Sequence, residues 1–122
     1  RGAVCSKYSW GSDDPDQQLC WSGKQFRSGT CEVGQYAVTL QGSTELRGQR
    51  GVFDLAGNVW EWTATPYCAM SNGTGKCLGS HVIRGGSWDD GNSEHMRAAF
   101  RNTIIASDRN SNIGFRCAQD AP

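Results

Sequence analysis

Hydrophobic and polar positions alternate clearly in only a few short stretches of the chain. In residues 58–67 (NVWEWTATPY), large side chains alternate with small or polar ones up to Pro66, which predicts a strand that ends at the proline. Residues 81–88 (HVIRGGSW) predict a second strand, which Gly85 and Gly86 interrupt. Short strands joined by turns are therefore expected in place of long helices.

The rest of the pattern is weaker. Residues 112–119 (NIGFRCAQ) predict a third strand, and residues 36–42 (YAVTLQG) fit a short strand or an extended segment. Residues 1–35 show no sustained period of 3.6 or 2.0, so we expect irregular structure pinned by cysteines. Residues 89–111 form a long polar connection without obvious periodicity, and such a connection is usually functional or disordered.

Length and composition support a loop-rich single domain. The chain has 122 residues, 37% of them hydrophobic, and 16 glycines. Twelve basic residues balance twelve acidic ones, so no general attraction to nucleic acid is expected. The sequence contains no apolar run long enough for membrane insertion, which we therefore do not expect either.

Six cysteines in so short a chain indicate an oxidising compartment, so we expect an extracellular, cell-surface or periplasmic protein. Sequence alone leaves the connectivity open. The chain has no CxxC motif, and His81 and His95 do not stand at zinc-ligand spacing, so a zinc site is not expected. The preferred disulfides are Cys68–Cys77, Cys20–Cys31 and Cys5–Cys117.

Several motifs occur together in a distinctive order: YSWGSDDPD, GVFDLAGNVWEW, VIRGGSW, MRAAFRN and NIGFRCA. In order and spacing they resemble the signatures of the formylglycine-generating enzyme (sulfatase-modifying factor) family, over residues 8–120. The resemblance implies an α+β, C-type lectin-like fold that is loop-rich, with short antiparallel strands, few helices and stabilising disulfides. Arg1-Gly2 is similar to the end of a helix that family members carry earlier in the chain. We therefore expect residues 1–122 to be a single domain that lacks its N-terminal segment.

The resemblance also implies a structural calcium ion, held by carboxylates and backbone carbonyls. These hard oxygen donors suit Ca²⁺, and a glycine among them lets the backbone fold around the ion. The alternative is that the carboxylates cap turns or pair with arginine, while Trp60 and Trp62 are core aromatics. The corresponding residues here are Asp54, Gly57, Val59 and Glu61.

The family's catalytic copper is held by two cysteines just after the Gly-Gly-Ser-aromatic motif. Here no cysteine lies between Cys77 and Cys117, so thiolate ligation of copper has no ligands at that place and we expect neither copper nor catalysis. His95 as a lone acid or base has no evident partner, and an isolated histidine is usually a solvated side chain. Asp89 and Asp90, with the nearby Glu94, fit a paired-carboxylate site less well than a solvated loop.

Some proteins of this fold group are the variable proteins of diversity-generating retroelements, whose last segment is diversified to bind new ligands. Residues 88–112 have the composition of such a surface, with apolar side chains set among Asn, Ser and Asp. Of Phe100, Ile104 and Ile105, we expect at least one to be buried as core. The leading hypothesis is therefore a non-catalytic module that binds a protein or cell-surface ligand, and the alternative is an oxidoreductase relative or fragment acting on cysteine. The expected ligand-binding residues are Trp88, Asp89, Asp90, Asn92, Glu94, His95, Phe100, Asn102, Thr103, Ile104, Ile105, Asp108 and Asn110.

Overall fold

The computed structural model describes residues 6–36, 53–68 and 77–117. Within these ranges the regular elements are few and short. They are the strands β1 (Trp60–Cys68), β2 (Cys77–Arg84), β3 (Asn102–Ile105) and β4 (Ile113–Gly114), and one 3₁₀ turn, η1 (Ser93–Met96). The described residues include no helix long and apolar enough to cross a membrane.

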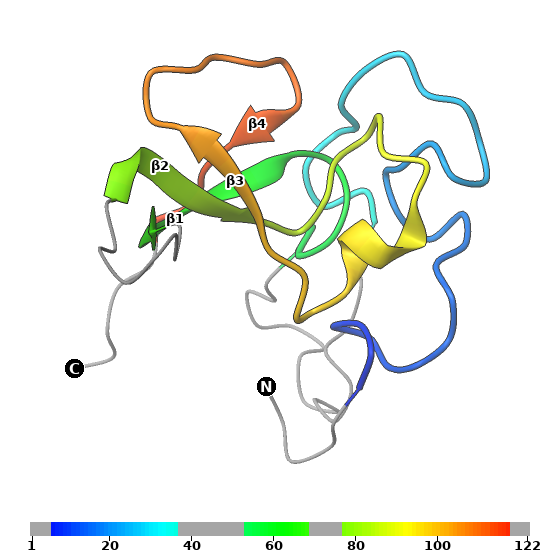
Figure 1. Ribbon diagram of the computed structural model, residues 1–122. Coiled ribbons are helices and arrows are strands. Elements are labelled where there is room, and N and C mark those ends of the chain that lie inside the picture. The colour runs from blue at the N-terminus through cyan, green and yellow to red at the C-terminus, as the bar shows by residue number, and fades with distance from the viewer. Residues whose placement is uncertain (1–5, 37–52, 69–76, 118–122) are drawn as a thin grey trace.

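The four strands form one small mixed sheet with the order β3-β2-β1-β4 (Figure 1). The β1–β2 and β2–β3 pairs are antiparallel, as expected. The β1–β4 pair is parallel, which the expectation of antiparallel strands did not include. A parallel neighbour needs a long return connection, and here the chain between β1 and β4 contains β2, η1 and β3.

The prediction that the first strand ends at Pro66 is wrong. β1 continues to Cys68, and Pro66 is paired with His81 of β2. The register shifts between Trp62 and Pro66, so the proline stands at an irregular part of the ladder, where strands tolerate a residue without an N–H. The second strand does end before Gly85, as its glycines predicted.

The connection at residues 89–111 contains two regular elements that periodicity did not show. η1 and β3 have four residues each, too few for a period to be recognised. The strand predicted at 112–119 is limited to Ile113–Gly114 within the described residues. Of the stretch 36–42, which fits a short strand or an extended segment, residues 37–42 lie outside the described residues.

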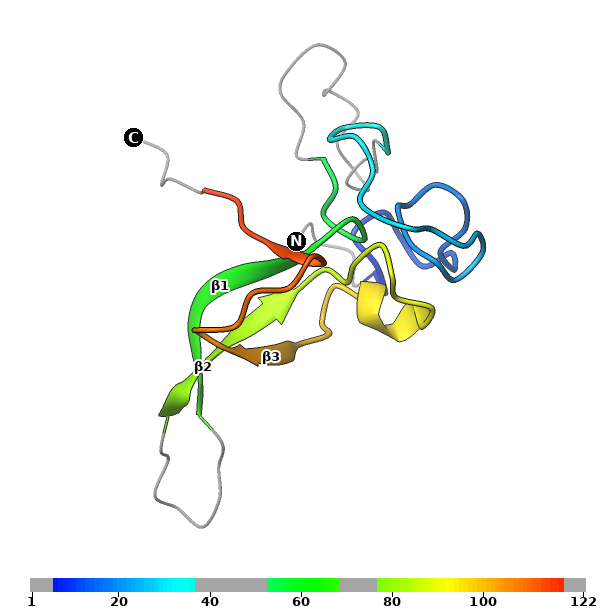
Figure 2. The same ribbon diagram turned by 90° about the horizontal axis from the view of Figure 1, so that it is seen from above.

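The principal core lies between loops rather than on the sheet. It joins the side chains of the irregular segment 6–36 to the Gly-rich turn before β1 and to η1. Figure 2 shows this segment, in blue and cyan, gathered beside η1 and away from the far ends of β1 and β2. The cluster consists of Tyr8, Leu19, Trp21, Ala56 and Met96.

The cysteines agree with the expected pairing in part. Cys20 and Cys31 form the predicted disulfide, which closes the irregular segment. Cys68 is disulfide-bonded and its backbone lies opposite Cys77, but the Cys68–Cys77 bond itself stays a prediction. Cys117 carries a free, exposed thiol among the residues that the structure describes, so the predicted bridge from Cys117 to Cys5 is wrong.

Candidate functional site

The Gly57-Asn58 turn before β1 organises the surroundings of the candidate surface. Gly57 has a φ of 77°, and a Cβ placed there would lie 2.5 Å from the Cys20 carbonyl oxygen, so only glycine fits. Its N–H donates to the Gly85 carbonyl at 2.9 Å. The Asn58 carbonyl accepts from the Trp88 N–H at 2.9 Å, and its side-chain oxygen accepts from the Cys31 N–H at 3.0 Å. The turn therefore joins the disulfide loop to the start of the segment 87–100.

Ser87 begins that segment and is fully buried. Its Oγ lies 2.6 Å from both Asp89 Oδ1 and Asp90 Oδ2, and its N–H donates to Asp90 Oδ2 at 2.8 Å. Asn112 adds its Nδ2 at 3.1 Å from both oxygens of Asp89. Burial alone would raise the pKa of Asp89, but the hydrogen bonds from Ser87 and Asn112 outweigh it and hold the pKa below its ordinary value.

His95 is not a solvated side chain, contrary to the sequence-based expectation. Its Nδ1 contacts Asp90 Oδ1. Its ring lies 5.6 Å from the Trp60 ring and 4.8 Å from the Phe100 ring, measured between centroids. The pair Asp90–His95 is thus set beside aromatic side chains, and Trp60 is only 4% exposed.

The other residues near η1 also make internal contacts. Asn92 caps the turn, because its Oδ1 accepts from the Glu94 N–H at 3.0 Å. Glu94 pairs with Arg97 at 2.7 Å, and the hydrogen bond from that guanidinium lowers the pKa of the carboxyl. The Trp88 carbonyl accepts from the Ser22 hydroxyl at 2.8 Å. The segment 87–100 is therefore tied to the scaffold along its length.

The segment 102–112 differs from the segment 87–100 in its exposure to solvent. In β3, Thr103 and Ile104 are half-buried, while residues 105–111 are exposed without interruption. None of the three apolar side chains expected as anchors is fully buried, since Phe100 and Ile104 are half-buried and Ile105 is 53% exposed. The expectation that one of them belongs to the core is wrong. We call residues 105–111, which include the predicted Asp108 and Asn110, the display loop.

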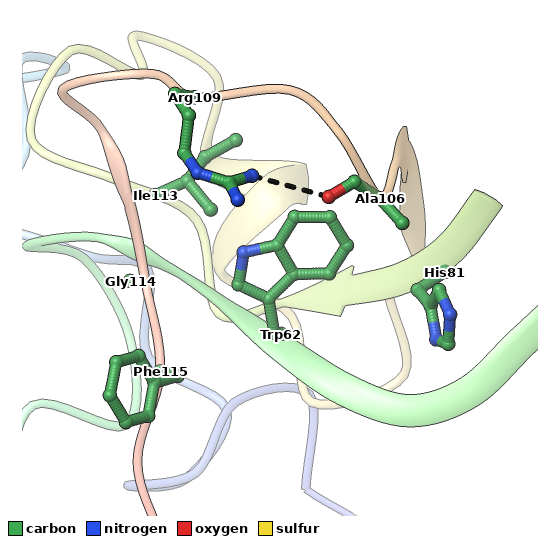
Figure 3. A pocket seen from close by; sticks show the side chains of 7 residues that line it. All are labelled: Trp62, His81, Ala106, Arg109, Ile113, Gly114 and Phe115. Carbon is green, nitrogen blue, oxygen red and sulfur yellow. Dashed lines mark hydrogen bonds between the residues drawn. The ribbon is translucent and has the colours of Figure 1, made fainter. Parts of the chain in front are cut away.

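A pocket of about 490 Å³ lies between the display loop and the sheet (Figure 3). Its lining residues come from β1, β2, the display loop and β4. No single stretch of the sequence could therefore predict the pocket. Trp62, a core aromatic in the alternative to the calcium hypothesis, is half-buried and lines this pocket. The lining residues are Trp62, His81, Ala106, Arg109, Ile113, Gly114 and Phe115.

A family profile, described as the sulfatase-modifying factor enzyme 1-like domain, matches residues 1–121 of the chain. The chain belongs to this family. Among curated members, it is 34% identical over 119 residues to the inactive C-alpha-formylglycine-generating enzyme 2 of Bos taurus, covering 93% of this chain and 38% of that protein. It is 31% identical over 137 residues to the formylglycine-generating enzyme of Streptomyces coelicolor, covering 98% of this chain and 42% of that protein. The chain thus spans about two fifths of the length of these relatives.

A solved member of the same fold is Treponema denticola variable protein 1. It superposes with a TM-score of 0.68 at 25% sequence identity, covering 93% of this chain and 41% of that one. This match, with the small mixed sheet, the few helices and the disulfide, confirms the expected C-type lectin-like fold. The sulfatase-modifying factor family resemblance drawn from the sequence motifs is confirmed as well.

At the calcium site that the family resemblance implies, the carboxylates already have partners. Glu61 accepts from the Arg116 guanidinium through both oxygens, at 2.7 Å from Nε. Arg116 also donates to the Phe53 and Asp54 carbonyls, each at 3.0 Å, and Asp54 Oδ2 accepts from the Gly34 N–H at 2.8 Å. At Glu61 the structure has the alternative arrangement, an ion pair with arginine. Calcium bound by these residues stays a prediction, which titration with Ca²⁺ and a thermal unfolding measurement would check.

Proposed function

We propose that this domain is a non-catalytic ligand-binding module of the sulfatase-modifying factor family, whose binding surface is formed by the exposed side of β3 and the display loop. The observation that carries the proposal is the uninterrupted exposure of residues 105–111 on a backbone that is held at both ends. The Ala106 N–H donates to the Gly79 carbonyl at 2.9 Å, and Asn112 binds Asp89. Loop side chains on a rigid scaffold can change without disturbing the fold.

The lack of the family's copper ligands supports a non-catalytic role. The span in which the resemblance implies two copper cysteines contains none, and in their neighbourhood Asp90 contacts His95. A carboxylate and an imidazole do not supply the soft thiolate ligands that Cu(I) prefers. The Bos taurus relative described as inactive is in keeping with this proposal.

The ligand that we propose is a protein or another molecule on a cell surface, met in an extracellular or periplasmic compartment. The disulfide chemistry of the chain supports that setting. The similarity to a solved variable protein supports the further proposal that the display loop is diversified by a retroelement. A search of the gene's surroundings for a template repeat and a reverse transcriptase tests this point, and the absence of both would contradict it.

Two randomised libraries test the binding surface. One varies six exposed positions of β3 and the display loop, and the matched control varies six exposed positions of the irregular N-terminal segment. Both libraries are selected against the same panel of folded proteins. We expect binders mainly from the first library, and equal recovery from both would contradict the proposal. The positions are Asn102, Ile105, Ser107, Asp108, Asn110 and Ser111 in the first library, and Ser12, Asp13, Gln17, Gln18, Lys24 and Gln25 in the control.

The 31% identity to the formylglycine-generating enzyme of Streptomyces coelicolor favours one second candidate, an oxidoreductase acting on cysteine. The chain is incubated with copper and a cysteine-containing peptide, with that enzyme as positive control. Mass spectrometry then detects conversion of cysteine to formylglycine. We expect no conversion by this chain, and turnover would overturn the non-catalytic proposal.

A further inference from the structure

The pocket under the display loop has apolar walls that are open to solvent. The Trp62 indole forms its floor, and Ile113 and Phe115 line it from the β4 side (Figure 3). Phe115 is 76% exposed, an unusual position for a phenylalanine directly after a strand. A concave site of about 490 Å³ lies within the size range of ligand pockets and accommodates one large side chain with its adjacent backbone.

The charge at the pocket comes from one fixed arginine. Arg109 Nη1 donates to the Ala106 carbonyl at 3.2 Å and to the Asp108 carbonyl at 2.9 Å, both within its own loop. Figure 3 shows its guanidinium pointing toward the Trp62 indole. Within the described part of the chain, no carboxylate forms an ion pair with Arg109.

The other lining residues contribute no acidic group either. His81 is the second polar lining residue, and its ring lies edge-on to Trp62 with centroids 6.0 Å apart. The pocket therefore combines an apolar hollow with a positioned guanidinium whose Nε and Nη2 form no hydrogen bond within residues 6–36, 53–68 and 77–117. A ligand that complements this pocket has a large apolar side chain and a carboxylate on the adjacent residue.

We propose that this pocket binds a segment of a partner protein in which a large apolar side chain, such as tryptophan, stands next to an aspartate or glutamate. The apolar side chain enters the hollow over Trp62 and the neighbouring carboxylate pairs with Arg109. This inference rests on the proposed binding function and deepens it by naming the ligand chemistry. Tryptophan and arginine are also the residue types that most often dominate binding at protein interfaces.

Three short peptides test the proposal on the ¹⁵N-labelled 122-residue chain. They are acetylated and amidated Gly-Trp-Asp-Gly, Gly-Trp-Asn-Gly and Gly-Trp-Lys-Gly, so the first two differ in charge at nearly the same shape, and the third carries the opposite charge. The measurement is the NMR shift of the Trp62 indole N–H during titration. We expect saturable shifts, with the Asp peptide about three- to five-fold tighter than the Asn peptide, as for an exposed ion pair, and the Lys peptide weakest.

Two substitutions assign the effect to the pocket. Arg109→Gln should remove the preference for the Asp peptide and leave binding of the Asn peptide unchanged, while the matched variant Arg101→Gln, an exposed arginine outside the pocket, should keep the preference. Phe115→Ser should weaken all three peptides alike by removing an apolar wall. All three positions are exposed, so the variants should fold, which their NMR spectra show directly.

The outcomes separate this proposal from the proposed function. If no peptide shifts the Trp62 indole N–H signal, the pocket assignment is overturned. This outcome includes the case in which another part of the same protein covers the pocket. Equal affinity for the three peptides, or an Asp preference that survives Arg109→Gln, would overturn the acidic ligand class. In either event, binders recovered from the display-loop library would leave the proposed function standing.

Discussion

The segments 87–100 and 102–112 have similar polar compositions, yet the structure uses them in opposite ways. In the first, Asp89 and Asp90 accept hydrogen bonds from the buried Ser87, and the His95 ring lies beside Trp60. In the second, residues 105–111 face solvent. A single ligand surface over residues 88–112, as the sequence suggested, therefore divides into a structural half and a displayed half.

The difference follows from where each segment starts. The first begins at the buried Ser87 and passes the buried Met96, so several of its polar groups lie close to the protein interior and form hydrogen bonds there. The second leaves β3 at the sheet edge and crosses the surface, where water satisfies its polar groups. Side-chain changes should therefore cost stability in the first segment and alter recognition in the second.

The largest expected effect is at the turn that supports the first segment. Gly57→Ala places a Cβ against the Cys20 carbonyl in a left-handed conformation, so we expect about 2–5 kcal/mol lower free energy of unfolding. Gly91→Ala is the control, because a Cβ there meets nothing within 4 Å. Urea unfolding of both variants measures the difference. Similar stability of the two would contradict the proposed role of the turn.

Ser87→Ala removes the hydroxyl that lies between the two aspartates. We expect a loss of about 1–3 kcal/mol in the free energy of unfolding, since Asp90, whose side chain is largely buried, is left with fewer donors. Ser107→Ala in the display loop changes the same chemical group at an exposed position, where the expected change is within about 0.5 kcal/mol. The comparison fails if both serines have the same effect in denaturant unfolding.

Acid should weaken the first segment through Asp89. Its pKa is lower in the folded protein than its ordinary value, so its contribution to stability is present above that value, near 3.9, and is lost as the pH falls through the folded pKa. We expect the free energy of unfolding to decrease as the pH falls below about 4, and Asp89→Asn to make this decrease shallower. Unfolding curves at a series of pH values measure the slope. An unchanged slope in the variant would contradict the assignment.

The smallest expected effect is in the display loop itself. Asp108→Asn and Asn110→Asp should each change the free energy of unfolding by less than about 0.5 kcal/mol, because both side chains are exposed. Thermal unfolding measures this, and a loss above 1 kcal/mol in either variant, the scale of a buried hydrogen bond, would show that the loop has a structural role.

Much of the fold was predictable because its signals are local. The glycines after residue 84 predicted the end of β2, and the turn-rich first segment predicted irregular structure closed by Cys20–Cys31. The end of β1 was not predictable, because whether Pro66 stops a strand depends on an irregular ladder with β2. β3 and the one-turn η1 are too short to leave a period in the sequence.

The candidate site was predictable only in part. The composition of residues 88–112 indicated a recognition surface, and the exposure of Asp108 and Asn110 agrees with that. No local pattern predicted that Asn112 would bind Asp89, or that Arg116 would pair with Glu61, because these partners are 23 and 55 residues apart. Such contacts depend on how the segments pack.

By itself the sequence determined the family, the loop-rich character and the glycine turn at residue 57, because ordered motifs and steric limits on the backbone act over a few neighbouring residues. The tertiary structure alone decided which polar side chains turn inward and where the pocket lies. Both depend on elements that are distant in the chain, such as β1, β4 and the display loop, meeting at one place. The contacts of a side chain depend on how these distant elements pack. An Asp or Asn can therefore have a structural partner in one segment and be exposed to solvent in the next.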